Sequence, residues 1–519
     1  MPETSSPETH LCPPAPKQIP STPVAAIRNP ERPRELHFQF VTHACMKFSG
    51  RFGTLLVDPW FLNQPIANYV CWKFPRAVIP PEEVVAGVDW VYITHCHEDH
   101  FHLPSIAHFP KDQAFLLPEY DHHPGLRAQT MERTLRKMGF HNIRKLRSWE
   151  SLELGDGARL TVVPAADSRY YEWENSGIVI EYAGTRIIDM NDNITDEHLC
   201  AQICARFPEG FDLGLIQAAG TSMFPGCFRM SEADKRAVVA ERHVAMNDQR
   251  RMIELIQPRA IAPVAGDFAW FAPQYAHNNW ASRGTPLLFR SLLSSDYADM
   301  DMPLLMFHPS DTWTRERGFE QHHPTIDWAN FLPLVDREVA RFWPKVRALE
   351  AWLDEVDLDN LLARSIAHTE RVQALITREH IDFTARFRHV IEGPDAGFSF
   401  VLKADPDSGF EIDWTDDEPV DQTLYVPQRE WAAVLEGRML WTDIQWNGEA
   451  DQHVEFRYDI ARFWYWLEYY VAINTKQPQV ILEPDLYPGA PTLDLSKGVF
   501  ALEGEWDNVF AAHRPEPGA

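Results

Sequence analysis

A short apolar stretch that runs directly into a cluster of histidines and carboxylates constrains this chain more than any other feature. Residues 90–100 read Trp-Val-Tyr-Ile-Thr-His-Cys-His-Glu-Asp-His, and the first four predict a buried strand. His95 and His97 alternate at the exit of this strand, so both are expected to point at one spot. Asp99 and His100, at the start of the next element, are expected to point at a second spot close by. Since zinc and iron share imidazole and carboxylate ligands, this spacing predicts a metal cradle with room for two ions.

The excess of acidic over basic residues limits the kinds of partner that the chain can bind. A formal net charge of −27 over 519 residues argues against nucleic acid and anionic membrane surfaces, because both would be repelled. No run approaches the roughly eighteen apolar residues of a membrane-spanning helix, and the start of the chain lacks the apolar core of a signal peptide. Seven cysteines without a regular spacing do not describe a disulfide framework. We therefore expect a protein of the reducing cytoplasm.

The pattern along the chain predicts three segments. Residues 1–33 are rich in proline and are expected to form a disordered leader. Residues 34–324 alternate strand-type and helix-type stretches and are expected to form one catalytic domain. Its first two strands are expected at 37–43 and 53–58, joined as a hairpin. Residues 325–519 are expected to form a C-terminal domain of helices plus a small α/β unit.

The histidine cluster resembles the signature of the metallo-β-lactamase fold, and the resemblance extends to both sides of it. More specifically, residues 37–320 resemble the metallo-β-lactamase-like part of the CMP-N-acetylneuraminate hydroxylase family. The stretches that carry this resemblance include His-Ala-Cys at 43–45, Asp-Pro-Trp at 58–60, Tyr-Ile-Thr-His at 92–95 and Pro-Val-Ala-Gly at 263–266. The resemblance implies an α/β protein, an αββα metallo-β-lactamase sandwich with a C-terminal α+β extension.

Hydrolases of this fold add three ligands after later strands: a histidine, a bridging aspartate and a last histidine. In this sequence the first of these positions falls on Asp167, where a carboxylate stands in place of imidazole. The bridging position falls on Asp192, with Asp189 as its rival. The last position falls on Ala265, which has no ligand atom. The chain therefore departs from the common pattern at two histidines.

The histidine cluster and the resemblance together give four sets of expected site residues. The expected metal ligands are His95, His97, Asp99, His100, Asp167 and Asp192. The expected catalytic residues are Asp99, Asp192 and Asp267, and Asp58 and His43 are expected to support the ligands from behind. The candidates to complete a second ion site are Asp267, Glu172, Glu174, His277 and His308.

The exchange of imidazole for carboxylate makes the site harder and more anionic, which suits iron better than zinc. We therefore expect two iron ions, with zinc as the alternative, and an oxygenase that hydroxylates a small polar substrate with O₂ and an external electron donor. The family that the chain resembles carries a Rieske domain, which needs Cys-x-His and Cys-x₂-His pairs. None of the seven cysteines here begins such a pattern. The expected donor is a separate Rieske-type or ferredoxin-type protein, and a homo-oligomer stays open.

Two other functions stay open. A metal-dependent hydrolase of the lactonase or phosphodiesterase type would use Asp192 to bridge two ions and a metal-bound hydroxide as the nucleophile. A binding or scaffold protein would keep the site only as a relic. The intact histidine cluster argues against the relic, and Asp167 together with Ala265 favours the oxygenase over the hydrolase.

Overall fold

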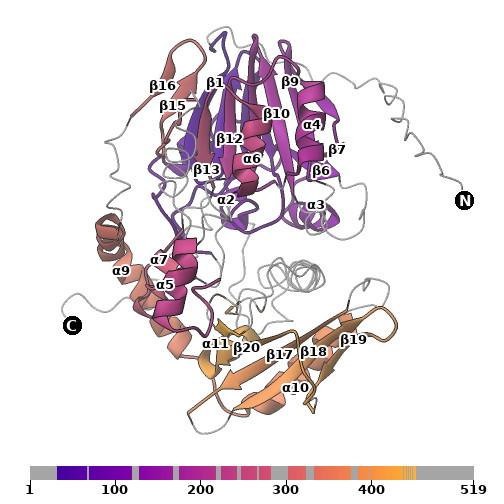
Figure 1. The fold of residues 1–519 in the computed structure, drawn as a ribbon, viewed down its shortest axis with the longest axis vertical. Helices are drawn as coiled ribbons and strands as arrows, with labels where there is room; N and C mark the ends of the chain where they lie inside the picture. The colour runs from indigo at the N-terminus through magenta and orange to yellow at the C-terminus, as the bar shows by residue number, and fades with distance from the viewer. Residues whose placement is uncertain are drawn as a thin grey trace, which may run out of the picture.

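The fold is that of a computed structural model, drawn in Figure 1. The predicted leader lies almost entirely outside the residues that the structure describes. These are residues 32–66, 69–119, 128–166, 175–193, 195–217, 224–241, 247–265, 268–281, 302–322, 332–375, 384–394, 397–415, 417–436, 438–439, 441, 444, 446 and 448–451.

The first sheet has eight strands. In spatial order they are β16 (Gly318–Glu320), β15 (Thr312–Thr314), β1 (His37–Thr42), β2 (Cys45–Gly50), β3 (Gly53–Val57), β5 (Trp90–Tyr92), β6 (Ala114–Glu119) and β7 (Ile143–Arg147). β1, β2 and β3 pair antiparallel, whereas β3, β5, β6 and β7 run parallel. All five residues of β3 are buried, which is typical of a strand covered on both faces.

The second sheet has six strands. In spatial order they are β13 (Ile261–Val264), β12 (Leu213–Gln217), β11 (Thr185–Asn191), β10 (Ser176–Tyr182), β9 (Ala158–Pro164) and β8 (Ser151–Gly155). The first three run parallel to one another, and the others pair antiparallel.

The two sheets face each other and helices cover their outer faces, as Figure 1 shows. Apolar residues of both sheets form the core between them, with Phe48 and Val57 from the first sheet and Ile180 from the second. The outer face of the first sheet packs on α1 (Pro81–Val85), α2 (Leu103–Ile106) and α3 (Ala128–Lys137). The outer face of the second packs on α4 (Glu197–Arg206) and α6 (Asn247–Ile256). The predicted αββα sandwich is confirmed.

The predicted hairpin between strands at 37–43 and 53–58 is wrong, because a whole strand lies between them. β1 ends at Thr42 and turns through only two residues, His43 and Ala44, into β2. His43 adopts a positive φ of 51°, which lets the chain reverse within so short a turn. The Ser-Gly-Arg-Phe-Gly stretch then makes the second turn, from β2 to β3. His43 therefore sits at the tip of a turn rather than inside a strand.

The C-terminal part contains a five-stranded sheet covered by helices on one face. Its spatial order is β19 (Gly409–Asp413), β18 (Phe398–Asp405), β17 (Ala385–Glu392), β20 (Gln422–Pro427) and β21 (Glu449–Ala450). β17 alternates buried and half-buried residues, which is typical of a sheet with one solvated face. The accompanying helices are α9 (Leu332–Asp354), α10 (Leu361–Leu375) and α11 (Gln428–Leu435).

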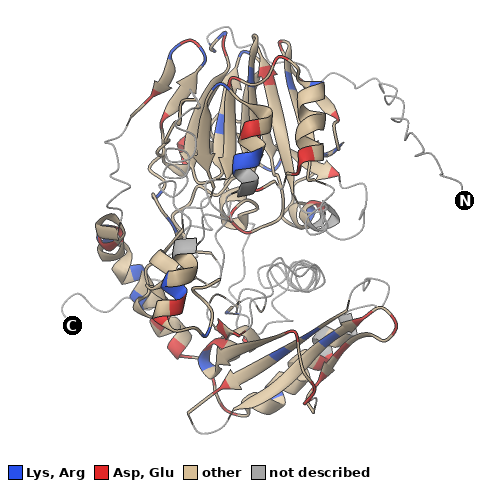
Figure 2. Cartoon of the chain, viewed as in Figure 1, with Lys and Arg blue, Asp and Glu red and all other residues tan. Residues whose placement is uncertain are grey.

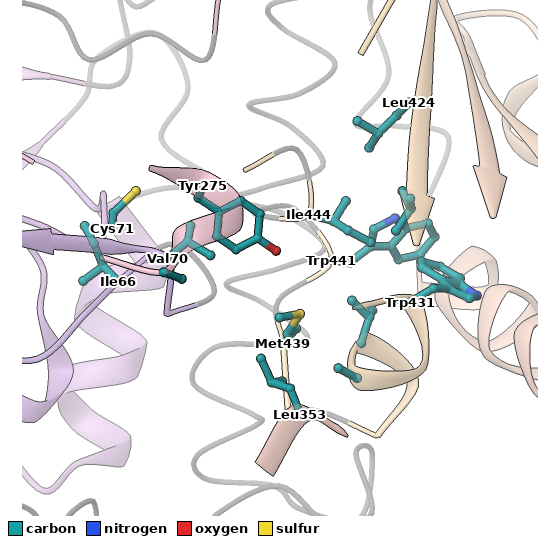
Figure 3. Close-up of a cluster of buried hydrophobic side chains, with 14 of the residues drawn as sticks. Ile66, Val70, Cys71, Tyr275, Leu353, Leu424, Trp431, Met439, Trp441 and Ile444 are labelled. Carbon is teal, nitrogen blue, oxygen red and sulfur yellow. The ribbon is translucent and has the colours of Figure 1, made fainter. Parts of the chain in front are cut away.

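One apolar cluster joins this C-terminal sheet to the sandwich. Figure 3 shows Tyr275 and Cys71 on one side of it and Trp431 and Trp441 on the other. The sandwich side also contributes a two-stranded ribbon of β4 (Cys71–Lys73) and β14 (Phe268–Trp270), with η2 (Pro273–Tyr275) and α7 (Asn278–Ala281) next in the chain.

The backbone extends the C-terminal sheet across the junction. Phe228 bridges to Ala450 of β21, Arg229 N donates to Ala450 O at 2.8 Å, and Ala450 N donates to Cys227 O at 2.8 Å. The Arg229 guanidinium forms ion pairs with Glu392 and Glu449. This segment, residues 227–229, precedes α5 (Glu232–Glu241).

Some of the described helices carry both acidic and basic residues. Figure 2 shows both signs on α5, α6 and α9 in this view. Among the described residues, no helix is both long enough and apolar enough to span a bilayer.

Candidate metal centre

Strand ends from both sheets converge on the histidine cluster. Four residues at or just beyond the ends of β1, β3, β11 and β13 have positive φ angles: His43 (51°), Asp58 (46°), Asn191 (45°) and Ala265 (48°). For residues other than glycine this conformation costs about 1 kcal/mol or more each, so the surrounding structure must hold it in place. Such backbone strain concentrates at functional sites.

The first ligand group consists of His95, His97 and Asp192. One ligand atom from each lies within 4.8 Å of the others. His95 Nε2 and His97 Nδ1 are only 2.6 Å apart, because the bend after β5 turns both rings toward one point. The two histidines therefore converge as predicted, and Asp192 reaches the same point from the end of β11.

The second ligand group consists of His43, Asp99 and His100, with the same spacing limit of 4.8 Å. His43 Nε2 lies 3.0 Å from Asp99 Oδ2, and His100 Nε2 lies 3.3 Å from the same oxygen. His100 Nε2 is also 3.4 Å from Asp192 Oδ2 of the first group. Asp192 therefore lies between the two groups, where a bridging ligand would lie.

Asp58 holds the loop from behind. This fully buried carboxylate accepts four hydrogen bonds: from Thr94 N at 2.8 Å, Thr94 Oγ1 at 2.7 Å, His100 Nδ1 at 2.8 Å and Asn191 Nδ2 at 2.6 Å. The bond to Nδ1 orients the His100 ring so that Nε2 faces the carboxylates of both groups. Asp58 thus ties the end of β3 to the loop after β5 and to the end of β11.

Thr94 fixes the orientation of His95. Its hydroxyl donates to Asp58, so the 2.9 Å contact with His95 requires that Nδ1–H donate to Thr94 Oγ1. This assignment leaves Nε2 of His95 with a free lone pair directed at the first group, as a metal ligand requires.

The electrostatics of the site favour a cation. Burial alone would lower the pKa of His100, but the carboxylates of Asp99, Asp192 and Asp58 raise it well above the usual value. Burial alone would raise the pKa of Asp99, but His100 and His43 hold it well below its usual value. Buried His100 Nε2 and Asp192 Oδ1 also lack a well-formed hydrogen bond to any described residue. The donor types and these unsatisfied atoms fit divalent metal ions.

Asp189, the rival of Asp192, lies in neither group. Its side chain is fully buried, and its oxygens lack a well-formed hydrogen bond within the described residues. Burial, reinforced by the nearby Asp58 carboxylate, raises the pKa of Asp189 well above its usual value. The geometry therefore favours Asp192 over Asp189 as the residue that faces an ion.

The other candidates are placed elsewhere or not described. Asp167, Asp267, Glu172 and Glu174 lie outside the described residues. His277 contacts Gly226 O at 3.1 Å, and His308 donates its backbone N–H to Asp311, so neither belongs to a ligand group. From the sequence, His43 was expected only to support the ligands from behind. The two-residue turn between two strand-type stretches was the feature that could have indicated its place beside Asp99 and His100.

Aromatic rings line one side of the second ligand group. The His43 ring lies 5.1 Å from Trp60 and 5.0 Å from Phe268 between ring centroids. Lys73 Nζ lies 4.5 Å from the centre of the Trp60 ring and donates to Trp60 O at 2.6 Å. Burial holds the pKa of Lys73 well below its usual range. The ribbon of β4 and β14 thus forms one side of the site.

The sequence profile of the beta-lactamase superfamily domain matches residues 54–259, which include the histidine cluster and Asp192. With the four-layer fold and the paired ligand groups, this match decides the family. The chain contains a metallo-β-lactamase superfamily domain.

Curated relatives of the chain include two kinds of protein. It is 25% identical over 246 residues to cytidine monophosphate-N-acetylneuraminic acid hydroxylase of Danio rerio, covering 45% of this chain and 38% of the relative. It is 26% identical over 239 residues to a Mycolicibacterium smegmatis protein named as a Rieske 2Fe-2S iron-sulfur protein, covering 45% and 44%. The chain therefore matches less than half the length of these relatives.

Two solved structures are similar over part of the chain. The diiron beta-hydroxylase CmlA from Streptomyces venezuelae has a TM-score of 0.36 and 16% identity, covering 54% of each chain. The isothiocyanate hydrolase from Delia radicum gut bacteria has a TM-score of 0.38 and 15% identity, covering 54% of this chain and 99% of the other.

Proposed function

We propose that this metallo-β-lactamase domain is a non-haem, two-iron oxygenase that hydroxylates a small polar substrate with O₂ and an external electron donor. The observation that carries the proposal is the pair of three-donor groups built around residues 95–100, each with a carboxylate and two imidazoles. Bound iron would supply the redox chemistry with dioxygen.

The chain's own residues have distinct roles in this proposal. His95, His97 and Asp192 hold one ion, and Asp99 and His100 hold the second. Asp192 lies 3.4 Å from His100 Nε2 and is proposed to bridge the two ions. Asp58 and Thr94 orient the rings from behind, as their hydrogen bonds to His100 and His95 require. We further propose Asp167 as a ligand of the first ion and Asp267 as a catalytic residue, both on grounds of sequence alone.

Iron is proposed over zinc because a carboxylate replaces an imidazole of the hydrolase pattern at Asp167. This exchange makes the site harder and more anionic. The name of the Danio rerio relative adds support for hydroxylation. The sugar nucleotide in that name is not transferred to this chain, because the match covers only 38% of the relative.

The electron donor is proposed to be a separate Rieske-type or ferredoxin-type protein. Relatives named as Rieske proteins support an iron–sulfur donor, and the 519 residues contain no Cys-x-His or Cys-x₂-His pair for a Rieske cluster. No disulfide joins any two of the six cysteines that the structure describes, which fits the reducing cytoplasm that we propose as the compartment.

A measurement of metal content and redox response tests this function. The full chain is purified without air and analysed for metals, and its optical spectrum is recorded before and after reduction and re-exposure to air. We expect about two irons per chain, a near-ultraviolet band that responds to redox state, and O₂ uptake with a chemical reductant. A His97→Ala variant should lose iron and O₂ uptake, whereas His277→Ala, outside both groups, should keep them.

The second candidate is a metal-dependent hydrolase. The position of Asp192 between the two ligand groups favours it as well, since a bridging aspartate suits two zinc ions. In that case the purified protein would contain zinc and show no redox response. That outcome would overturn the oxygenase and direct the search to lactones and phosphodiesters.

A further inference from the structure

Ala265 leaves the second ion one ligand short of the common pattern. It follows β13, where hydrolases of this fold place their last histidine, and its methyl group offers no donor. Yet the second group contains a third donor, because His43 reaches it from the turn between β1 and β2. We propose that His43 takes over the role of the missing histidine and is a direct ligand of the second ion. This inference rests on the proposed two-ion centre but not on the identity of its metal.

The backbone brings the two positions together. Ala265 N donates to His43 O at 3.2 Å, so the end of β13 and the tip of the β1–β2 turn lie side by side. Both residues have positive φ angles, 51° and 48°, so each strand bends at this contact. A side chain at either position can therefore approach the loop of residues 95–100 from the same side.

The His43 ring is held in place for this role. Its ring is buried, and Trp60 and Phe268 lie against it, with ring centroids 5.1 Å and 5.0 Å away. Its Nε2 lies 3.0 Å from Asp99 Oδ2, and its ring centroid lies 5.9 Å from that of His100. A ring fixed by aromatic neighbours with one nitrogen beside a ligand carboxylate is arranged as a preorganised metal ligand.

Taking the third ligand from His43 instead of from position 265 keeps the type of donor atom and changes the strand that supplies it. An imidazole replaces an imidazole, so the second donor set still consists of one carboxylate and two imidazoles. All three of its members now follow strands of the first sheet, since His43 follows β1 and Asp99 and His100 follow β5. Among the described ligands, only Asp192 comes from the second sheet. The second ion would then depend on the β1–β2 turn instead of the end of β13.

Moving the histidine back to β13 tests the inference. Metal content by elemental analysis and affinity by chelator competition are measured for wild type, His43→Ala, the double variant His43→Ala/Ala265→His, and His277→Ala. We expect His43→Ala to keep the first ion and bind the second more than about 100-fold more weakly, a larger loss than the 10- to 100-fold typical of residues that only orient ligands. The double variant should regain the second ion, and His277→Ala should match wild type.

Other outcomes separate this inference from the proposed function. A His43→Ala protein that binds two ions within about threefold of wild-type affinity overturns the ligand role, since a loss below tenfold is weaker even than an orienting role. Wild type without any metal overturns the proposed centre itself. Should His43→Ala fail to fold, cadmium-loaded wild type with isotope-labelled histidine gives the answer by NMR. Coupling of cadmium to His43 as well as to His95, His97 and His100 supports the inference, and its absence at His43 refutes it.

Discussion

Replacing Asp58 with asparagine should weaken metal binding and stability together, because this carboxylate accepts four hydrogen bonds in a fully buried position. Asparagine has the same shape but only one accepting oxygen. If that oxygen takes the place of Oδ2, the new amide nitrogen faces the Thr94 N–H, so two donors oppose each other. If the amide is reversed, its nitrogen faces three donors, from Thr94, His100 and Asn191.

The size of the effect follows from this count. Each buried group left without its partner costs about 1–3 kcal/mol. The two donors that oppose each other should therefore lower the unfolding free energy of Asp58→Asn by about 2–6 kcal/mol. The ring of His100 also loses the charge-assisted bond that orients it. Loss of such an orienting partner lowers metal affinity about 10- to 100-fold.

Chemical denaturation and chelator competition measure the two effects. Asp311→Asn is the matched control, because Asp311 is equally buried and accepts from the backbone N–H groups of His308 and His322. It should lose stability but keep wild-type metal affinity, since Asp311 touches neither ligand group. An Asp58→Asn protein that binds both ions as tightly as wild type would refute the orienting role of Asp58.

Three further predictions concern acid stability, the junction and the β10–β11 contact. Burial lowers the pKa of His389 to about 3, so the unfolded chain binds a proton at this histidine at a higher pH than the folded chain does, and the unfolding free energy should fall as the pH drops below about 6.5. At about pH 5 this histidine should have lowered the unfolding free energy of wild type by about 2 kcal/mol. Denaturation curves of His389→Gln should lack this loss. Arg229→Met removes two half-exposed ion pairs, so it should lower the unfolding free energy by only about 1 kcal/mol. It should nevertheless speed hydrogen exchange at the backbone amides of residues 229 and 450. Unchanged exchange would contradict a role of these ion pairs in holding residues 227–229 against β21. A Cβ at Gly177 would lie 2.8 Å from Asp189 O, so Gly177→Ala should displace β11 and lower the unfolding free energy by about 1–3 kcal/mol. Because Asp192 follows β11, metal binding should weaken as well. An unaltered metal affinity would contradict this prediction.

The sequence by itself predicted where the candidate metal centre lies. A strand of β-branched and aromatic residues followed by His95, His97, Asp99 and His100 predicted a cradle, because alternation and a bend at a strand end are local properties. The two ligand groups of the structure lie there, one on His95 and His97 and one on Asp99 and His100. The αββα layering was implied by the resemblance to the metallo-β-lactamase fold, and the alternating strand and helix periods along the chain agree with it.

Only the tertiary structure decided which distant residues complete each group. The sequence favoured Asp192 and kept Asp189 as its rival, and the structure places Asp192, but not Asp189, beside His95 and His97. His43 lies 56 residues before Asp99, and its approach requires both the two-residue turn and the contact with Ala265. A turn's direction in space depends on sheet pairing between remote segments, which local sequence patterns do not encode. The candidate ligands within one loop can therefore be predicted from the sequence, whereas the candidate ligands that come from other strands depend on the fold.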